Sequence, residues 1–509
     1  MLNYIDKKLN MVTMYRLVLY YLIGLLVFAV FFGFLGVISY TPLALVLSTI
    51  YITFICWLTN LVFSRVFKAQ TNIESVYITA LILVFIINPL TSFFDISFLM
   101  LATWASVLAM ASKYILAIRK KHIFNPAAIA VVITALFLGQ SASWWIGTTW
   151  MVVPVIIGGF LLTRKLIRTD LVVSFLVTSL VMVVGSRIFS GGSILTTAER
   201  FILSSPVLFF AFIMLTEPLT SPPTKNLRIT YGIITGLLFA PFVHLGSLHS
   251  TPELALVIGN VFVYLVSPKE KLVLKLKELK EIGKDTYDFI FTPDRKFTFR
   301  PGQYLEWTLG HKNTDSRGNR RYFTLASSPT EETVRMGIKF YPNSSSFKSK
   351  LITLKPGDTI MASGRAGDFV LPKDSTKKLV FIAGGIGITP FRSMIKYLLD
   401  SKEKRDIVLF YSNRKIEDVA YTEVFDEAQI KLGIPTVYTL TDRTSAPNSW
   451  LGEVGAIDRT MIVRNVPDFR DRTFYVSGPN RMVKAFEDTL KKMGVNNSQI
   501  ITDFFPGFA

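Results

Sequence analysis

The segment Ala383-Gly384-Gly385-Ile386-Gly387-Ile388-Thr389-Pro390 decides the fold of the C-terminal half. It follows an apolar run at residues 378 to 383 that predicts a strand, and it precedes residues 391 to 399, which predict a helix. Glycines at such a turn let backbone amides approach a dinucleotide pyrophosphate at the positive end of the helix. A glycine-rich turn can also be only a tight connection. In this order, strand, glycine turn and helix predict a nucleotide-binding α/β domain, with Gly384, Gly385, Gly387, Thr389 and Pro390 at the cofactor.

About 60 residues earlier, Arg321-Tyr322-Phe323-Thr324-Leu325-Ala326-Ser327 places a guanidinium, aromatic rings and a hydroxyl on one predicted strand. Arg321 can clamp a pyrophosphate as a planar fork, and Phe323, beside Tyr322, can pack on a flavin or its ribityl chain. The hydroxyl of Thr324 can hydrogen-bond flavin N5. A surface strand could carry the same residues, so this pattern gains weight only beside the glycine turn.

Short predicted strands with turns run from about residue 272, and strand–helix alternation follows from residue 378. Further segments stand in a recognisable order around the two motifs: Arg300-Pro301-Gly302-Gln303-Tyr304, Ser345-Ser346-Phe347-Lys348, Pro356-Gly357-Asp358 and Gly367-Asp368-Phe369. Residues from about 272 to 509 thereby resemble the ferredoxin–NADP reductase superfamily. The resemblance implies an antiparallel β-barrel that binds FAD at residues 268–375 and an α/β domain that binds NAD(P)H at residues 376–509.

Two later segments resemble the nicotinamide side of the same superfamily. Tyr475-Val476-Ser477-Gly478-Pro479 resembles its strand-end Cys-Gly-Pro, with Ser477 in place of the cysteine that faces the nicotinamide. A plain Gly478-Pro479 turn is the alternative. Related reductases often place a C-terminal aromatic residue or an acid near the flavin ring, which would assign Phe505 and Asp503. Thr324, Ser477, Asp503 and Phe505 are thus the candidate catalytic residues.

The choice between NADH and NADPH depends on residues after the strand predicted at 406 to 411. Ser412, Asn413 and Arg414 could meet a 2′-phosphate, which favours NADPH. Arg414 could equally pair with Glu417 or Asp418, so the preference stays open.

The N-terminal half is far more apolar than a soluble domain. Hydrophobic residues make up 50% of the chain, and long apolar stretches recur up to about residue 266. Residues 1–267 therefore predict a polytopic α-helical membrane domain that lies in the lipid bilayer. Ten spans are predicted, at 15–39, 41–63, 74–92, 96–117, 124–139, 146–163, 170–186, 201–218, 229–246 and 251–267.

Basic residues predict the orientation of these spans. Alternate loops carry Lys and Arg, which remain on the cytoplasmic side. Both termini are then cytoplasmic, in a bacterial-type plasma membrane, and the first apolar run is too long for a cleavable signal. The net charge of +19 has this topological explanation and does not indicate nucleic acid.

The sequence restricts the possible electron carriers. Cys56 is the only cysteine, whereas an iron–sulfur cluster normally takes four. The membrane half holds only His122, His244 and His249, all at span ends or in loops, where no ligand role is expected. Neither haem nor a metal centre is expected, which leaves flavins and quinone.

Two segments of the membrane half repeat, Ile87-Asn88-Pro89-Leu90-Thr91-Ser92 and Thr216-Glu217-Pro218-Leu219-Thr220-Ser221. An odd number of spans separates them, so they form an inverted repeat, and such repeats often bind a ligand at their interface. Proline could instead merely cap each helix. A carboxylate at membrane depth favours a functional role for Glu217, and Asn125-Pro126 opens the fifth span in a similar way.

With Phe124-Asn125-Pro126-Ala127-Ala128, these segments resemble the RnfD/NqrB family of membrane flavin subunits over residues 70 to 265. The resemblance implies a second flavin, FMN or riboflavin, with Asn125 and Glu217 as candidate ligands. In that family FMN is often esterified to a Ser or Thr on the outer side, and Ser190-Gly191-Gly192-Ser193 is the nearest match. Ser193 is the candidate attachment site, although a plain flexible loop and a noncovalent flavin fit better.

The expected protein passes electrons from cytoplasmic NAD(P)H through FAD into the membrane domain, and then to quinone or an extracytoplasmic acceptor. The alternative is a redox-driven or redox-sensing transporter or ion pump with an attached reductase. Quinone reduction at the cytoplasmic face is a third possibility. The oligomeric state is left open.

Overall fold

The computed structural model describes residues 5, 9, 12–67, 73–92, 94–118, 121–189, 191–240, 242–246, 248–267, 271–311, 314–315, 319–342 and 344–503. Phe505 lies outside the described residues. The chain forms two compact units, Met1–Lys269 and Glu270–Ala509. Their boundary falls two residues after the predicted end of the membrane domain at residue 267.

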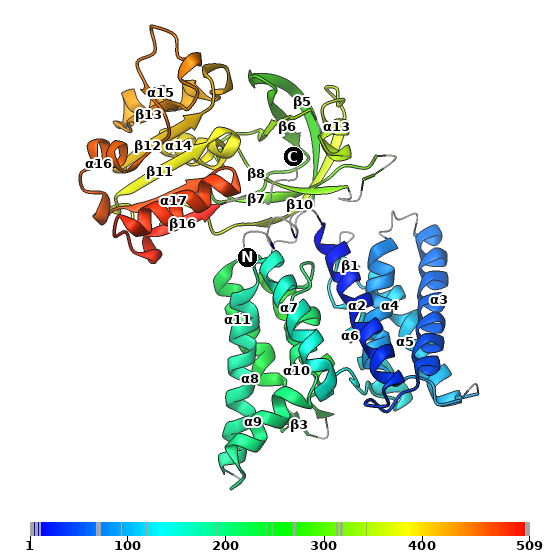
Figure 1. Cartoon of the computed structure of the whole chain (residues 1–509). Coiled ribbons are helices and arrows are strands. Elements are labelled where there is room, and N and C mark those ends of the chain that lie inside the picture. The colour runs from blue at the N-terminus through cyan, green and yellow to red at the C-terminus, as the bar shows by residue number, and fades with distance from the viewer. Residues whose placement is uncertain are drawn as a thin grey trace. The chain divides into compact units, whose positions relative to one another are not determined.

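The first unit is built from apolar helices that run roughly side by side (Figure 1). They are α2 (Met14–Phe34), α3 (Pro42–Val66), α4 (Ile73–Ile86), α5 (Ile96–Ile115), α6 (Pro126–Leu138), η1 (Thr149–Met151) leading into α7 (Val152–Leu166), α8 (Thr169–Phe189), α9 (Ile194–Leu203), α10 (Val207–Phe209) continuing as the π-helix η2 (Phe210–Met214), α11 (Lys225–Leu238) and α12 (Pro252–Val266). Two short hairpins join them, β1 (Ala117–Ile118) with β2 (Lys121–His122), and β3 (His244–Leu245) with β4 (Leu248–His249).

Each of the ten predicted spans contains a helix, but the helices differ in length. Within the described residues, five are long and apolar enough to cross a membrane: α2, α3, α5, η1–α7 and α8. The pair α9 and α10–η2, bent by 58°, would make a sixth. Helices α4, α6 and α12 are shorter, at 14, 13 and 15 residues. Ten complete spans therefore remain a prediction.

Local sequence explains where several of these helices begin. Thr41, Asn125 and Thr251 each accept a hydrogen bond from a first-turn amide, at the starts of α3, α6 and α12. A proline follows each of these caps, at a position where its missing N–H costs nothing. Small residues then allow close packing: a Cβ on Gly236 of α11 would lie 2.9 Å from the side chain of Thr178 on α8.

The second unit contains two six-stranded sheets. The first is antiparallel, in the order β8-β7-β10-β5-β6-β9. Its strands are β5 (Leu272–Gly283), β6 (Thr286–Pro293), β7 (Tyr304–Thr308), β8 (Arg320–Thr324), β9 (Val334–Lys339) and β10 (Thr359–Ala366), with the short helix α13 (Ser346–Leu351) beside them. A backbone hydrogen bond from Ala326 to Arg335 links the residues after β8 to β9. Closure into the predicted barrel remains a prediction.

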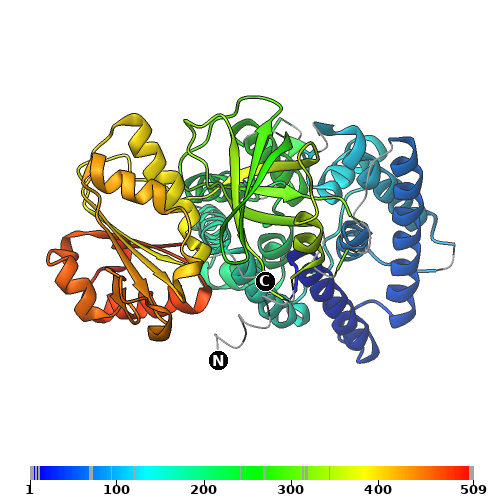
Figure 2. The ribbon, with the colours of Figure 1, turned by 90° about the horizontal axis from the view of Figure 1, so that it is seen from above.

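The second sheet is parallel, in the order β14-β13-β12-β11-β15-β16. Its strands are β11 (Leu379–Gly384), β12 (Ile407–Asn413), β13 (Thr436–Leu440), β14 (Glu453–Val454), β15 (Thr473–Ser477) and β16 (Ile500–Asp503). Alternate residues of β11 point to opposite faces, which are covered by α14 (Thr389–Ser401) and α15 (Thr422–Leu432) on one side and by α16 (Arg459–Asn465) and α17 (Asn480–Lys492) on the other (Figure 2). The predicted boundary at 375/376 falls between the two sheets.

Candidate functional site

Four of the predicted site residues lie in two adjacent residue rows at the same end of the parallel sheet. Gly384 on β11 pairs with Ser412 on β12, and the neighbouring residue Ala383 pairs with Ser477 on β15. Ser477 pairs in turn with Asp503 on β16. All these strands are parallel, so the two rows mark their carboxyl ends. In open α/β sheets this edge is where nucleotides bind.

The glycine turn packs directly on the Ser477-Gly478-Pro479 turn. A Cβ on Gly387 would lie 2.6 Å from the Ser477 carbonyl oxygen and 2.6 Å from Gly478 Cα, a contact that no side chain tolerates. Gly385 has a φ of +53°, in the left-handed region. The turn runs through η3 (Gly385–Ile388) into α14, where Pro390 lies in the first turn. The 13-residue helix α14 directs its positive end toward this edge.

The predicted flavin residues lie together on the antiparallel sheet. Thr324 pairs with Tyr304 of β7 and is buried, and Tyr322 packs edge-on against the same tyrosine. The guanidinium of Arg321 lies 5.3 Å from the centre of the Phe347 ring, and the Phe323 and Phe347 rings lie 6.0 Å apart. Arg321, Phe323 and Phe347 therefore form one cluster, although Phe347 comes from a different element, the helix α13.

The Ser345–Lys348 segment is organised by its own hydrogen bonds. Ser345 caps α13, and the Ser346 hydroxyl lies 3.0 Å from the Asp315 amide and 3.0 Å from His311 Nε2. Lys348 is buried and donates from Nζ to the Lys339 carbonyl over 2.9 Å. Within this segment, Lys348 therefore has a structural contact with Lys339, the last residue of β9, and the sequence did not predict this contact.

Contacts between the two sheets bring the flavin residues near the glycine turn. A Cβ on Gly337 of β9 would lie 2.8 Å from the Thr389 side chain and 2.6 Å from the Tyr421 hydroxyl. Arg392 of α14 binds both carboxylate oxygens of Glu331 and donates to the Ala326 carbonyl over 2.9 Å. These contacts join the parallel-sheet domain to the antiparallel sheet that carries the predicted flavin residues.

A buried carboxylate completes this junction. Asp288 on β6 accepts from Arg335 Nη1 over 3.2 Å, and Arg335 also lies 3.6 Å from Glu331. Burial raises the pKa of Asp288, and the Arg335 guanidinium only partly opposes this shift. Sequence reasoning assigned no role to this network, because its members come from separate elements of the fold.

Asp503 is the last residue of β16, and Arg414 directly follows β12, so both lie at the carboxyl ends of the parallel strands. Burial raises the pKa of the Asp503 carboxyl to about 7. Arg414 is exposed, whereas its two expected partners pair elsewhere, Glu417 with Lys284 at 2.9 Å and Asp418 with Lys339 at 2.6 Å. Among the described residues both carboxylates thus pair with lysines, while Asp442 lies close enough to interact electrostatically with Arg414. The role of Arg414 at a 2′-phosphate stays a prediction.

In the membrane unit, Glu217 and Asn125 meet. Asn125 Nδ2 donates to Glu217 Oε2 over 2.9 Å, and His122 Nε2 lies 3.1 Å from Oε1 of the same carboxylate. The Thr220 hydroxyl donates to Oε2 over 3.0 Å. His122, expected to have no ligand role, thus contacts the candidate carboxylate. The other copy of the repeat lies elsewhere: Asn88 accepts from the Tyr40 hydroxyl over 2.7 Å.

A second set of polar groups supports this cluster. Asn260, fully buried in α12, accepts from the Asn125 backbone amide over 2.8 Å. Its Nδ2 donates to the Thr220 carbonyl over 3.2 Å and to the Tyr231 hydroxyl over 3.1 Å. Buried amides that satisfy one another in this way hold a rigid arrangement at apolar depth. Asn260 could have been identified from the sequence as a candidate site residue, because it is a polar residue within an apolar predicted helix.

A solvent-open pocket lies beside the cluster, and about 600 Å³ of non-atom space falls within it when the open solvent is included. The π-helix η2 ends next to it, a distortion that is frequent at functional sites. Lys113 Nζ donates to the Ser75 hydroxyl over 3.0 Å. Because Ser75 lines the pocket, this contact places a cation next to the pocket lining. The polar lining residues are Tyr15, Ser75, Thr79, Asn125, Thr216 and Glu217.

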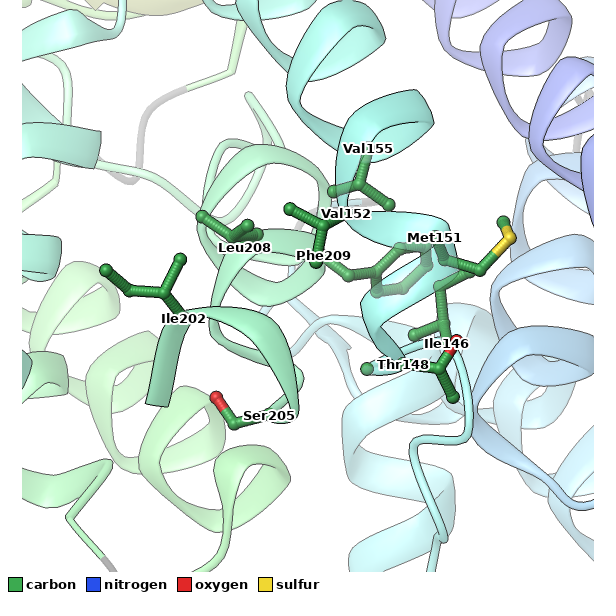
Figure 3. A pocket seen from close by; sticks show the side chains of 10 residues that line it. Ile146, Thr148, Met151, Val152, Val155, Ile202, Ser205, Leu208 and Phe209 are labelled. Atoms are coloured by element: carbon green, nitrogen blue, oxygen red, sulfur yellow. The ribbon is translucent and has the colours of Figure 1, made fainter. Parts of the chain in front are cut away.

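Another pocket of the membrane unit is much more apolar. It has about 200 Å³ of space between α7 and the bend at Ser205, and Figure 3 shows Val152, Val155, Leu208 and Phe209 around it. Among the described residues that line it, only Thr148 and Ser205 have polar side chains, and none is charged. This lining is poorly suited to orienting a polar ring, in contrast to the cavity beside Glu217.

Ser193 precedes α9 as its N-cap residue. Its side chain is exposed and makes no capping hydrogen bond within the described part of the chain, while its carbonyl accepts from the Thr197 hydroxyl over 2.8 Å. The hydroxyl is thus accessible, as a site of covalent attachment must be.

Comparisons with known proteins match both units. Over 237 residues the chain is 26% identical to the glycine betaine monooxygenase reductase of Pseudomonas aeruginosa (strain UCBPP-PA14), covering 46% of this chain and 64% of that protein. It is 33% identical over 163 residues to a component of the Na(+)-translocating NADH-quinone reductase of Serratia proteamaculans (strain 568), covering 31% of this chain and 40% of that protein. The crystal structure of the Amycolatopsis cytochrome P450 reductase GcoB aligns at 24% identity with a TM-score of 0.42, over 47% of this chain and 71% of that one. The chain thus spans less than two thirds of these two curated relatives.

Fold and relatives together indicate a reductase-type nucleotide-binding module, in one chain with a unit whose described residues include five helices long and apolar enough to cross a membrane. Residues 96–271 match the NQR2, RnfD, RnfE family, and residues 381–488 match the oxidoreductase NAD-binding domain. One chain therefore joins a segment that matches the NQR2, RnfD, RnfE family model to a reductase module, which confirms both resemblances seen in the sequence.

Proposed function

We propose that the protein oxidises NAD(P)H at the second unit and passes the electrons into the membrane unit. The observation that carries the proposal is the position of Gly384, Ser412, Ser477 and Asp503 at the carboxyl ends of four neighbouring parallel strands, in the same unit as the cluster of Arg321, Phe323 and Thr324. Arg321, Phe323 and Thr324 would hold FAD there, and FAD would supply a centre able to take hydride from a reduced nicotinamide and to pass electrons on singly or in pairs.

Each candidate site residue of the second unit has a defined task in the proposal. The Arg321 fork holds the FAD pyrophosphate, with Phe347 packed on its guanidinium, while Thr324 offers its hydroxyl to the flavin ring. The turn at Gly385 and Gly387 holds the pyrophosphate of the nicotinamide dinucleotide. Ser477 hydrogen-bonds the nicotinamide, and Asp503 holds a proton near neutral pH beside it.

In the membrane unit we propose a second flavin, FMN or riboflavin, in the cavity beside Glu217. An isoalloxazine ring presents both donors and acceptors along one edge, and Asn125, Thr216, Ser75 and Glu217 offer the complementary groups. A second redox centre is required for electrons to cross the membrane, because a bilayer about 30 Å thick is too wide for one electron-tunnelling step. The final acceptor is then quinone or an extracytoplasmic molecule.

A different function is favoured by one observation, the Glu217 carboxylate held by His122, Asn125 and Thr220. Such a cluster could bind a coupled cation, in which case the membrane unit is a redox-driven or redox-sensing transporter or ion pump. A transporter needs no second flavin, whereas an electron path does.

Counting flavins per chain in the detergent-purified protein tests the proposal. Acid precipitation before the count separates bound from covalent flavin. Two flavins per chain, one of them FMN or riboflavin, support the electron path, and flavin retained on the precipitated protein supports attachment at Ser193. FAD alone would reject the membrane flavin and favour the transporter or quinone reduction at the cytoplasmic face.

A further inference from the structure

Two histidines face each other across the hairpin β3–β4, in the segment His244-Leu245-Gly246-Ser247-Leu248-His249. His244 pairs with His249 in the antiparallel register, and the Ser250 amide donates to the Val243 carbonyl over 2.8 Å. The 243–250 pair is hydrogen-bonded, so 244–249 is the pair without mutual hydrogen bonds, in which side chains lie closest. Both imidazoles are exposed.

One hydrogen bond sets the tautomer of His244. Its Nδ1 lies 3.2 Å from the Gly246 carbonyl oxygen, which can only accept, so Nδ1 carries the proton. The lone pair of the neutral ring is then on Nε2. Metal-binding histidines commonly donate their other N–H to a backbone carbonyl in this way, which orients the ring and raises its basicity.

The ring spacing suits a shared ion. The two ring centres lie 5.3 Å apart, with the planes tilted by 47°. An imidazole nitrogen binds zinc at about 2.0–2.1 Å, which places a ring centre about 3.2 Å from the ion, so two centres at this spacing subtend about 110°. That angle is available to a four-coordinate ion.

The other two histidines of the chain are already engaged. His122 contacts Glu217, and His311 uses Nδ1 toward the Leu309 carbonyl and Nε2 toward Ser346. No group of three or more His, Cys, Asp and Glu ligands occurs in the described part of the chain, so the pair of His244 and His249 would leave coordination positions open to water or another ligand.

We propose that His244 and His249 form a binding site for one divalent transition-metal ion. The hairpin follows α11, which begins at the basic Lys225, and it lies at the same end of the unit as α9 (Figure 1). By the distribution of basic residues this end is extracytoplasmic. The site is distinct from the flavin sites and does not depend on them.

Copper(II) is the probe, because affinity for nitrogen ligands rises to Cu²⁺ along the first transition series. The full chain is purified with a histidine-free tag, so that its four histidines are the only imidazoles. Titration followed by electron paramagnetic resonance is expected to give one Cu²⁺ per chain with two nitrogen ligands. His244→Ala and His249→Ala should each lower the affinity about tenfold or more and leave one nitrogen.

The double variant separates a shared site from two independent ones. For a shared site, His244→Ala/His249→Ala binds little more weakly than either single variant, and His311→Gln retains the copper signal. If each single variant instead removes half of a two-copper stoichiometry, or if both retain the wild-type affinity, the proposal is overturned. NAD(P)H oxidation by each variant checks that the protein is folded.

Discussion

The Asn125 amide lies 2.9 Å from the Glu217 carboxylate, 92 positions later in the chain. The Asn125 backbone amide binds Asn260, which lies 135 positions beyond Asn125. Three segments of the membrane unit thus converge on one polar centre beside a pocket that Asn125 and Glu217 line. In an apolar unit such a centre is costly unless its groups pair with one another or with a ligand.

Glu217→Gln should reduce the second flavin per chain. Removing the charge weakens the hydrogen bonds to His122 and Asn125, and a charged hydrogen bond contributes about 1.5–3 kcal/mol, or about 10- to 100-fold in affinity. Flavin content is measured by extraction, while NAD(P)H-driven reduction of ferricyanide reports the second unit. Glu199→Gln, an exposed change on α9, should keep both flavins. Equal flavin content in the two variants would remove the membrane assignment.

Arg321→Ala should lower FAD affinity by about 10- to 100-fold, because a charged fork to the pyrophosphate is lost. Arg321→Lys should recover only part of the loss, since an ammonium cannot bind in bidentate fashion. The neighbouring Arg320 is 43% exposed and provides the matched control, Arg320→Ala. The measurement is FAD retained after gel filtration. Equal retention in all three variants would contradict the assignment.

Gly387→Ala should impair nucleotide binding more than Gly385→Ala. A Cβ at Gly387 meets the Ser477 carbonyl at 2.6 Å, whereas a Cβ at Gly385 meets nothing within 4 Å among the described residues and only strains the backbone. That strain costs about 1–2 kcal/mol. Steady-state KM for NADH and NADPH gives the comparison, and we expect an increase of at least about tenfold for Gly387→Ala. The reverse order would show that the turn does not pack as described.

Arg414→Ala should discriminate between the two nucleotides. If the exposed guanidinium binds a 2′-phosphate, KM for NADPH rises about 10- to 100-fold and KM for NADH is unchanged. Arg459→Ala, exposed at the start of α16, is the control. Equal effects on both nucleotides would indicate that the protein does not read the 2′-phosphate through Arg414.

Asp503→Asn should alter the pH dependence of stability. Burial raises the pKa of Asp503 to about 7, above its unfolded value, so the folded state holds this proton more tightly. The favourable contribution is present below about pH 4 and is lost as the pH rises to 7, by at most about 4 kcal/mol. The melting temperature of the second unit, followed by FAD fluorescence, should therefore fall less from pH 5 to 8 in Asp503→Asn. Asp488→Asn, an exposed change on α17, should match the wild type; if Asp503→Asn also does, the carboxyl is already ionised at pH 5.

The reductase unit was largely predictable from sequence. The glycine turn and the Arg321–Thr324 strand act through short-range backbone geometry, which a few adjacent residues determine. Helix positions in the membrane unit were predictable for a similar reason, since apolar runs must satisfy their backbone hydrogen bonds internally. The described helices include five or six of full-length span, and the remaining predicted spans stay predictions, because an apolar stretch does not reveal where its helix begins and ends.

Tertiary structure alone decided which distant side chains meet. His122, Asn260, Glu331 and Arg392 carry no local pattern that assigns them a partner, and their contacts span 61 to 135 positions. It also decided that Glu417 and Asp418 pair with Lys284 and Lys339, while Arg414 is exposed. Sequence determines local geometry through short-range backbone constraints, whereas long-range polar pairs form only where packing brings helices and strands together and excludes water.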